Sequence, residues 1–275
     1  MPQLRAVLWD GLALQGLALF DRDAASMMLT DGAPQAARRL AGAATQSSNE
    51  RVSAWLTDLR FSWAPLLEDA RALSLHKDQT LFHEGQPAQT VYVILDGRVR
   101  LSSFGIDGRE RHLMILGANG LLGDCSLPTS AHYGVSALAS SEVHLLALPA
   151  SDFLEALQMH PELAQQHRQL SSRRFGVLLQ HIQLQAHNSA GRRVCHHLLG
   201  LLHAHGAPTP HGSRITITFT QQEMGNICGL SRVSVSQVFS RLERLGVIAR
   251  HQRHVLICRP DVLALQAQGA GPALV

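Results

Sequence analysis

The sequence predicts an α+β protein with a small β-sheet domain, then a long helix, then a compact winged helix-turn-helix unit. Three observations support this order. Short β-forming runs separated by turns fill residues 79–150, an apolar heptad repeat spans 161–187, and two short helices joined by a tight turn occupy 219–250. Strand-rich and helix-rich segments that follow one another in this way are typical of α+β folds.

The first 75 residues are expected to precede the sheet. Residues 1–50 are rich in alanine and end in a polar stretch, which predicts an extension of loose helical pieces and a linker. The next segment, 51–75, has apolar residues at helical spacing and predicts helices that pack on the sheet. Its apolar positions are Trp55, Leu56, Leu59, Trp63, Leu66, Leu67, Ala70 and Leu73. No targeting signal is evident, and no run approaches the roughly 18 apolar residues of a membrane span, so a soluble, cytoplasmic protein is expected.

The sheet domain is predicted from strands and turns at regular spacing. The β-forming runs are 80–82, 91–95, 99–101, 111–115 and 143–148. Turn pairs ending in glycine fall at 84–85, 96–97, 107–108 and 119–120. This pattern predicts a small antiparallel barrel or sandwich. With its flanking helices the domain is assigned to residues 51–158.

A long helix is predicted behind Pro161, a residue that suits the first turn of a helix. Apolar residues recur every seven positions, at Leu163, Leu170, Val177 and Leu184, and Leu178 and Ile182 reinforce the stripe. Such a repeat is typical of a coiled-coil seam and predicts a dimerisation helix over 159–188.

The last unit, 189–275, has the local signals of a helix-turn-helix. Thr220 and Glu223 have capping-box spacing, Gly229 permits a sharp reversal, and Ser231 can cap the second helix. The apolar positions that pack the two helices are Met224, Ile227, Leu230, Val235, Val238 and Leu242. Residues 247–257 predict a two-stranded wing with a basic tip. An exposed, polar second helix next to a wing is the shape that enters a DNA major groove.

Charge and cysteine content agree with this interpretation. The net charge is only +3, but between Arg232 and Arg259 there are six arginines and one acid, Glu243. Local basicity beside a recognition helix provides phosphate affinity. The four cysteines are scattered without a CxxC pair, which predicts free thiols rather than a zinc ribbon or a disulfide framework.

Residues 78–262 resemble the Crp/Fnr (cyclic AMP receptor protein) family of transcription regulators. The resemblance is carried by LFHEGQPA at 81–88, VYVILDGRVRL at 91–101, and the helix-turn-helix segment 215–245. It implies a cyclic-nucleotide-binding-like jelly roll (β-roll) and a homodimer on a palindromic operator of double-stranded DNA. It also implies RNA polymerase as a protein partner, and a bacterial setting. Effector binding where the roll meets the long helix would shift the dimer between DNA-competent and incompetent arrangements.

The resemblance places the DNA-binding residues around the second helix. The candidates are Thr220, Gln221, Ser231, Arg232, Val233, Ser234, Ser236, Gln237, Arg241 and Arg253. Family members often carry Arg, Glu and Arg along the recognition helix. This chain keeps Arg232 but has Val233 and Gln237 at the other two positions. Glutamine pairs with adenine and valine can touch a thymine methyl, which predicts a half-site richer in A·T than is usual for the family.

The effector pocket also departs from the family pattern. The candidates are Gly123, Asp124, Cys125, Ser126, Leu127, Ala131, His132, Arg174 and Leu178. Cyclic-AMP binders carry Gly-Glu-x-[Ser/Ala]-Leu, followed by an Arg-[Ser/Thr]-Ala segment that clamps the phosphate. Here the carboxylate is Asp124, and the Arg and hydroxyl positions fall on Ala131 and His132. Leu178 and Leu179 stand where a hydroxyl pair would meet the base, so cyclic AMP is not the expected effector.

Other sensor chemistries stay open. Haem, a cyclic dinucleotide, another small molecule, a redox change at Cys125, or no ligand at all remain alternatives. An iron–sulfur cluster is not expected because no cysteine precedes Cys125. A group of histidines predicts solvated helix and loop positions rather than a metal site: His196, His197, His203, His205 and His211.

Two other function classes compete with a DNA-binding regulator. A haem- or small-ligand-binding sensor acting through a protein partner, with weakened DNA specificity, is the alternative suggested by the altered recognition helix. An enzyme is not expected, because the sequence shows no Ser-His-Asp arrangement, phosphate loop or paired carboxylate motif.

Overall fold

The computed structural model describes residues 53–57, 59–66, 70–125, 127, 131–251 and 254–270. Every contact discussed below lies within the unit Arg51–Val275. The predicted extension 1–50 lies outside the described residues, as do two site candidates, Ser126 and Arg253.

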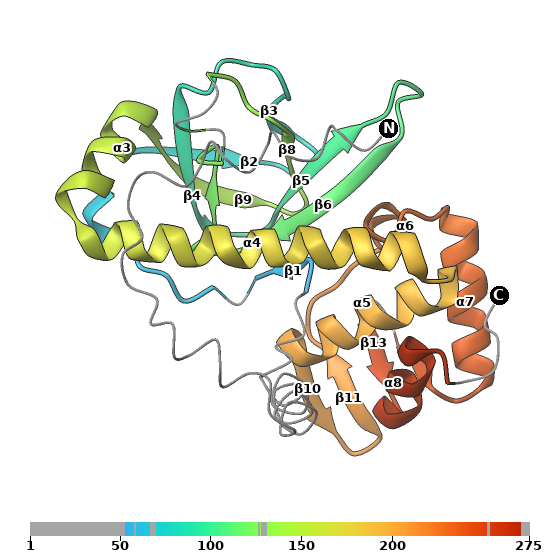
Figure 1. Ribbon diagram of the computed structural model, residues 1–275. Coiled ribbons are helices and arrows are strands. Elements are labelled where there is room, and N and C mark those ends of the chain that lie inside the picture. Colours follow the sequence, from blue (N-terminus) through green and yellow to red (C-terminus); the bar gives the residue numbers. More distant parts are fainter. Residues whose placement is uncertain are drawn as a thin grey trace, which may run out of the picture. The chain divides into compact units, whose positions relative to one another are not determined.

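Two packed sheets form the predicted β-roll (Figure 1). The sheet with strand order β1-β6-β5-β8-β3 contains β1 (Trp55–Leu56), β3 (Thr80–Phe82), β5 (Val99–Phe104), β6 (Glu110–Leu116) and β8 (Ser136–Ala139). The sheet with order β2-β9-β4-β7 contains β2 (Arg71–Leu75), β4 (Thr90–Asp96), β7 (Leu121–Leu122) and β9 (Val143–Pro149). Apart from the parallel pair β1–β6, the paired strands are antiparallel, as the glycine turns predict.

The turn between β4 and β5 shows why glycine punctuates this domain. Gly97 has φ 85°, and a Cβ atom there would collide with the carbonyl oxygen of Glu142. Only glycine combines this conformation with so close an approach of backbone.

The prediction of helices over 51–75 is wrong for the described part of that segment. It forms β1, a short 3₁₀ helix η2 (Ala64–Leu66) and β2. Trp55 and Leu56 are fully buried, and β1 pairs in parallel with β6, with Trp55 opposite Ile115. The apolar run therefore packs as a strand because a partner 60 residues further along the chain supplies its hydrogen bonds.

Three helices follow the roll: α3 (Ala150–Met159), α4 (Pro161–His187) and α5 (Ala190–His205). The predicted long helix is confirmed as α4. Its heptad stripe, however, is not exposed to a second copy. Leu163, Leu170, Val177 and Leu184 are buried within this chain, at 0%, 0%, 2% and 6% exposure.

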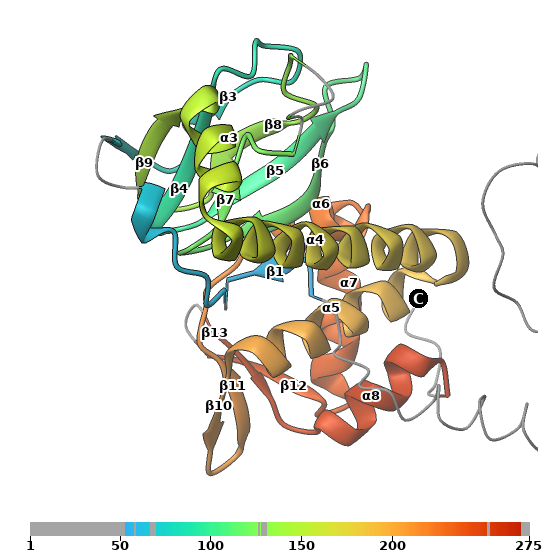
Figure 2. The same cartoon turned by 60° about the vertical axis from the view of Figure 1, so that its left-hand side comes forward.

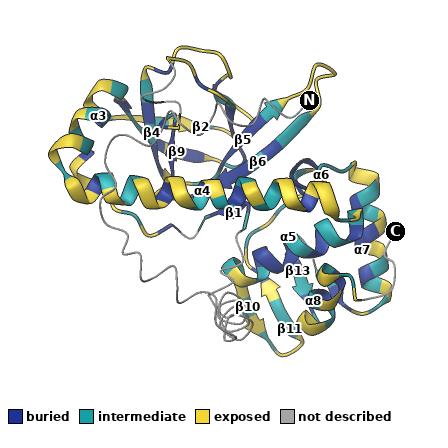
Figure 3. Ribbon diagram, viewed as in Figure 1, coloured by how far each residue is buried: buried dark blue, intermediate teal, exposed yellow. Residues whose placement is uncertain are grey.

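The exposed apolar residues of α4 lie on another face. Phe175 is 63% exposed, Leu179 46% and Ile182 63%. They are spaced at i, i+4 and i+7, so they share one side of the helix. Figure 3 shows exposed positions recurring along the length of α4. We call these three residues the α4 stripe.

The C-terminal unit is a winged helix-turn-helix (Figure 2). Its helices are α6 (Gln221–Cys228), α7 (Arg232–Arg244) and α8 (Pro260–Gln268). Its sheet has the order β10-β11-β13-β12, with β10 (Gly206–Thr209), β11 (Gly212–Ile215), β12 (Ile248–His251) and β13 (His254–Ile257). The predicted wing is confirmed as the antiparallel pair β12–β13.

The roll and the winged unit share packed residues. α6 lies against β6, and the Trp55 ring of β1 contacts the rings of His197 on α5 (centroids 5.8 Å apart) and Phe219 before α6 (6.1 Å). β1 therefore packs against both domains.

Candidate nucleic-acid interface

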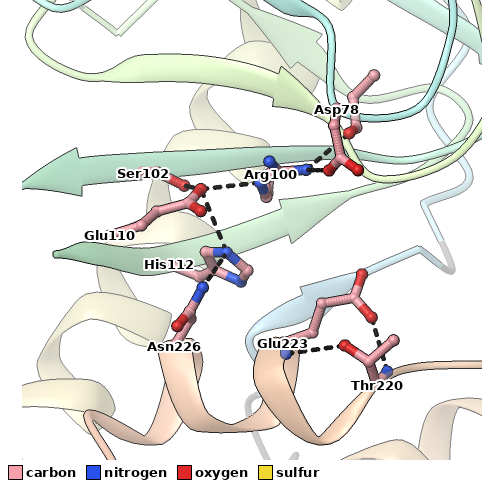
Figure 4. A network of polar contacts seen from close by, with 9 residues as sticks. Asp78, Arg100, Ser102, Glu110, His112, Thr220, Glu223 and Asn226 are labelled. Atoms are coloured by element: carbon pink, nitrogen blue, oxygen red, sulfur yellow. Dashed lines mark hydrogen bonds and ion pairs between the residues drawn. The ribbon is translucent and has the colours of Figure 1, made fainter. Parts of the chain in front are cut away.

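The start of each helix of the pair is held by side-chain caps, as predicted. The Thr220 hydroxyl accepts from the Glu223 N–H at 3.0 Å, and the Glu223 carboxylate accepts from the Thr220 N–H at 2.7 Å (Figure 4). Ser231 caps α7 by accepting from the Ser234 N–H at 3.0 Å. Gly229, at φ 66°, makes the left-handed turn between the helices. These caps fix the angle at which α7 leaves the turn.

α7 separates an apolar side from a polar side. Val235, Val238 and Leu242 are fully buried against the rest of the unit. On the opposite side Arg232 and Gln237 are exposed, and Val233 is 65% exposed. The exposed side of α7 is therefore polar and cationic, with the Val233 side chain among the polar ones.

A shallow groove of about 390 Å³ runs along this polar side. It is lined by Gln221, Arg232, Val233, Ser236, Gln237, Ser240 and Arg244. Five of these are predicted DNA-binding candidates, and the structure brings them together. Ser240 and Arg244 were missed, although they follow Gln237 at i+3 and i+7 on the same face. We call this surface the α7 groove.

Other candidates lie elsewhere. The hydroxyls of Thr220, Ser231 and Ser234 take part in the caps. Arg241 is half-buried, with its Nε atom buried and without a hydrogen-bond partner in the described chain. Arg241, a predicted DNA-binding residue, therefore does not line the α7 groove, because it lies nine residues, or half a turn of phase, from Arg232.

Positive charge in the α7 groove is not neutralised. Glu243, the acid next to Arg244 in the sequence, receives two hydrogen bonds of 2.6 Å from Arg250. Arg232 and Arg244 form no ion pair with any residue of the described chain. Their charges are thus available to an anionic partner.

The predicted effector pocket contains a buried ion cluster. Asp124, fully buried, accepts from Arg174 of α4 at 2.7 Å and lies 3.0 Å from Nε2 of His167. Arg174 also donates to the Leu121 carbonyl and approaches the Cys125 sulfur at 3.0 Å. Burial alone would raise the pKa of Asp124, but the charge of Arg174 and hydrogen bonds from His167 and Arg174 lower it to about 2.

The remaining pocket candidates are dispersed around this cluster. Leu127 and Leu178 are half-buried, while Ala131 and His132 are exposed. Gly123 has φ 83° and turns the chain between β7 and Asp124. His167 was not among the predicted pocket residues. No local signal could join it to Asp124, which lies 43 residues away.

A second polar network links the roll to α6 (Figure 4). Arg100 donates to Glu110 at 2.8 Å and to Asp78 at 3.0 Å, and Ser102 donates to Glu110 at 2.8 Å. His112, 1% exposed, lies with Nε2 3.3 Å from Glu110 and 3.1 Å from the Asn226 amide nitrogen.

Comparison with known proteins identifies the family. Residues 72–160 match the cyclic nucleotide-binding domain family, and residues 192–265 match the Crp-like helix-turn-helix domain family. A global nitrogen regulator of Synechococcus elongatus is 30% identical over 192 residues, covering 69% of this chain and 86% of that protein. The chain belongs to the Crp/Fnr family. The resemblance inferred from sequence is confirmed, and the protein is a DNA-binding transcription regulator of the Crp/Fnr type.

A further relative and a solved structure are also similar to this chain. A CRP-like cAMP-activated global transcriptional regulator of Mycobacterium tuberculosis is 25% identical over 205 residues, covering 74% of this chain and 92% of that protein. The structure of FixK2 from Bradyrhizobium japonicum superposes with a TM-score of 0.64 at 20% identity, covering 74% of this chain and 99% of that one. The second comparison shows a shared fold.

Two findings concern the predictions about membrane spans and about the histidine group. In the part of the chain that the structure describes, no helix is long and apolar enough to cross a membrane. Of the five histidines predicted to be solvated, His197 is 5% exposed, so that prediction is wrong for this residue. Burial, with the nearby charges of His196, His181 and Arg193, lowers its pKa to about 3.

Proposed function

We propose that this Crp/Fnr regulator binds a palindromic operator as a homodimer, with the α7 groove of each copy in a major groove. The α7 groove carries the proposal, because it combines exposed polar side chains, an exposed valine and unpaired arginines on one helix face. These are the groups that contact base edges and phosphates. The protein would act on RNA polymerase in the cytoplasm.

Base recognition is assigned to three residues of α7. Gln237 is suited to the N6 and N7 atoms of adenine, Val233 to a thymine methyl, and Arg232 to a guanine or a phosphate. All three are exposed on the same groove. The half-site would therefore be richer in A·T than one read by glutamate and arginine.

The α4 stripe is the proposed dimer contact. The heptad stripe first predicted for this role is buried inside one chain, whereas Phe175, Leu179 and Ile182 expose large apolar side chains on a 27-residue helix. Burial of such a stripe against a second copy is the ordinary route to an isologous dimer. Two α7 helices could then meet half-sites one helical turn apart.

We infer that cyclic AMP is not the effector. The carboxylate that would accept from the ribose is fully buried and already satisfied by Arg174 and His167. The position of the phosphate-clamping arginine is Ala131. Calorimetric titration with cyclic AMP should show no binding up to millimolar concentration, and micromolar binding would contradict the inference.

Operator selection from a random DNA pool tests the DNA proposal. The expected result is a palindrome with A·T-rich half-sites. The salt dependence of binding should then be measured on the selected operator and on an unrelated duplex. Added salt weakens phosphate binding equally on all sequences, so a preference for the operator that persists at high salt reports specific contacts. Enrichment of no sequence would overturn the proposal, and recovery of the usual family half-site would overturn the base assignment.

A further inference from the structure

The hairpin between β5 and β6 lies beside the start of the recognition helix. A cleft of about 490 Å³ separates the two. Arg109, Glu110 and Arg111 line it from the β-roll, and Asn226, Ser231 and Arg232 line it from the helix-turn-helix. Three arginines from two domains therefore face one space.

The acidic residues near this cleft do not cancel all of its charge. Glu110 is engaged by Arg100, Ser102 and His112; burial alone would raise its pKa, but these hydrogen bonds lower it to about 2. The carboxylate is thus ionised, and partners on its own sheet satisfy it.

The cations differ in how they are held. Arg109 pairs with Asp107 at 3.1 Å, but both side chains are largely exposed, at 74% and 57%, and such a pair is worth little. Arg111 and Arg232 form no ion pair or side-chain hydrogen bond with the residues described here. At least two positive charges in the cleft are available to an anion.

The hairpin is fixed relative to the helix-turn-helix. The buried His112 of β6 contacts Asn226 of α6 at 3.1 Å, and Asn226 in turn accepts from Gln222 at 2.8 Å. Arg98, the residue before β5, donates to the carbonyl of Thr218, which precedes α6, at 3.0 Å. Arg109 and Arg111 are therefore held at a set position beside Ser231 and Arg232.

We propose that Arg109 and Arg111 contact backbone phosphates at the edge of the major groove that α7 enters. The sensor domain would then form part of the DNA-binding surface. The proposal rests on the proposed function, because duplex phosphates come beside the start of α7 only when α7 enters the groove. Arg109, Ser231 and Arg232 are exposed, so the cleft suits the backbone of a large rigid ligand.

Salt dependence of binding tests this proposal. Arg111→Gln and the double variant Arg109→Gln/Arg111→Gln would be titrated on the selected operator and on an unrelated duplex. Each lost phosphate contact should lower the slope of log K against log salt by about 0.9, so the double variant should lose up to about 2. Affinity should fall by a similar factor on both duplexes, leaving the specificity ratio unchanged.

Two matched variants control for other causes. Arg71→Gln removes an equally charged, exposed residue from β2, on the other sheet, and should leave the slope unchanged. Gln237→Ala should reduce specificity without changing the slope. Thermal unfolding of each variant verifies that the fold is retained.

The outcomes separate the two proposals. A wild-type protein without a preferred operator would overturn the proposed function. An operator bound with the wild-type slope by the double variant would overturn the phosphate contact alone. Calorimetry with inorganic phosphate tests whether the cleft is instead a small-anion site. Phosphate binding that Arg111→Gln abolishes, together with an unchanged DNA salt slope, would show such a site and contradict the DNA contact.

Discussion

At the scale of single residues, specificity rests on Gln237. Its side chain is exposed in the α7 groove and makes no cap or side-chain hydrogen bond within the described part of the chain, so truncation should leave the fold intact. Gln237→Ala should weaken binding to the selected operator by about 1–3 kcal/mol and leave nonspecific binding unchanged. Fluorescence anisotropy on both duplexes measures this. Equal losses on both would show that Gln237 does not contact a base.

His197 should make stability depend on pH. Its pKa is about 3 in the folded chain and 6.5 as a free side chain, so the unfolded state binds more protons between these values and stability falls as pH falls below 6.5. Lowering the pH from 7.5 to 5.5 should remove about 1 kcal/mol of unfolding free energy through this group.

Urea unfolding of His197→Leu at both pH values tests this effect. The variant should lose that part of the pH dependence, whereas His187→Leu, at an exposed position, should keep it. An unchanged dependence in His197→Leu would assign the proton uptake to other groups.

Whether a residue's role could be predicted depends on how far away in the sequence its partner lies. The caps at Thr220 and Ser231 depend on neighbours three residues away and could be predicted from sequence. The pairing of Asp124 with Arg174 joins positions 50 residues apart and could not. The period of the α-helix could also have predicted which α7 residues line the groove: it places Ser240 and Arg244 in the α7 groove and turns Arg241 away.

At the scale of elements, β1 is the segment that sequence patterns misassigned. A two-residue strand has no periodicity of its own, and its apolar side chains fit a helical repeat equally well. Trp55 is fully buried between β6, α5 and Phe219, and its indole nitrogen has no partner in the described chain. Tertiary packing, rather than local propensity, decides its conformation.

Trp55→Ala should lower the free energy of unfolding by about 3–5 kcal/mol, because it empties a large space at the junction of both domains. Trp55→Phe keeps an aromatic ring and removes the unpaired N–H, so its cost should be clearly smaller. Chemical unfolding followed by circular dichroism measures both. Equal costs would indicate that ring packing is not what Trp55 contributes.

At the scale of the whole molecule, dimerisation shows what periodicity can and cannot tell. The repeat of Leu163, Leu170 and Val177 correctly predicts a long helix, but a heptad stripe does not state which surface it will meet. Here it meets the chain's own core, and the α4 stripe on another face of the helix stays exposed.

The α4 stripe should determine the oligomeric state. Phe175→Glu/Ile182→Glu should convert a dimer into a monomer at micromolar concentration, because the dimer would have to bury four unpaired carboxylates. Sedimentation velocity measures the change, and Gln183→Glu on the same helix should remain a dimer. A dimer in the double variant would place the interface elsewhere. Operator affinity should fall when dimerisation is lost, because a single copy contacts only one half-site.

The most direct test of the central claim is a structure of the protein bound to its selected operator. The expected result is two copies joined along α4, with α7 of each in successive major grooves and Arg232 and Gln237 at the base edges. A single copy on the duplex, or an α7 groove turned away from the DNA, would contradict the account.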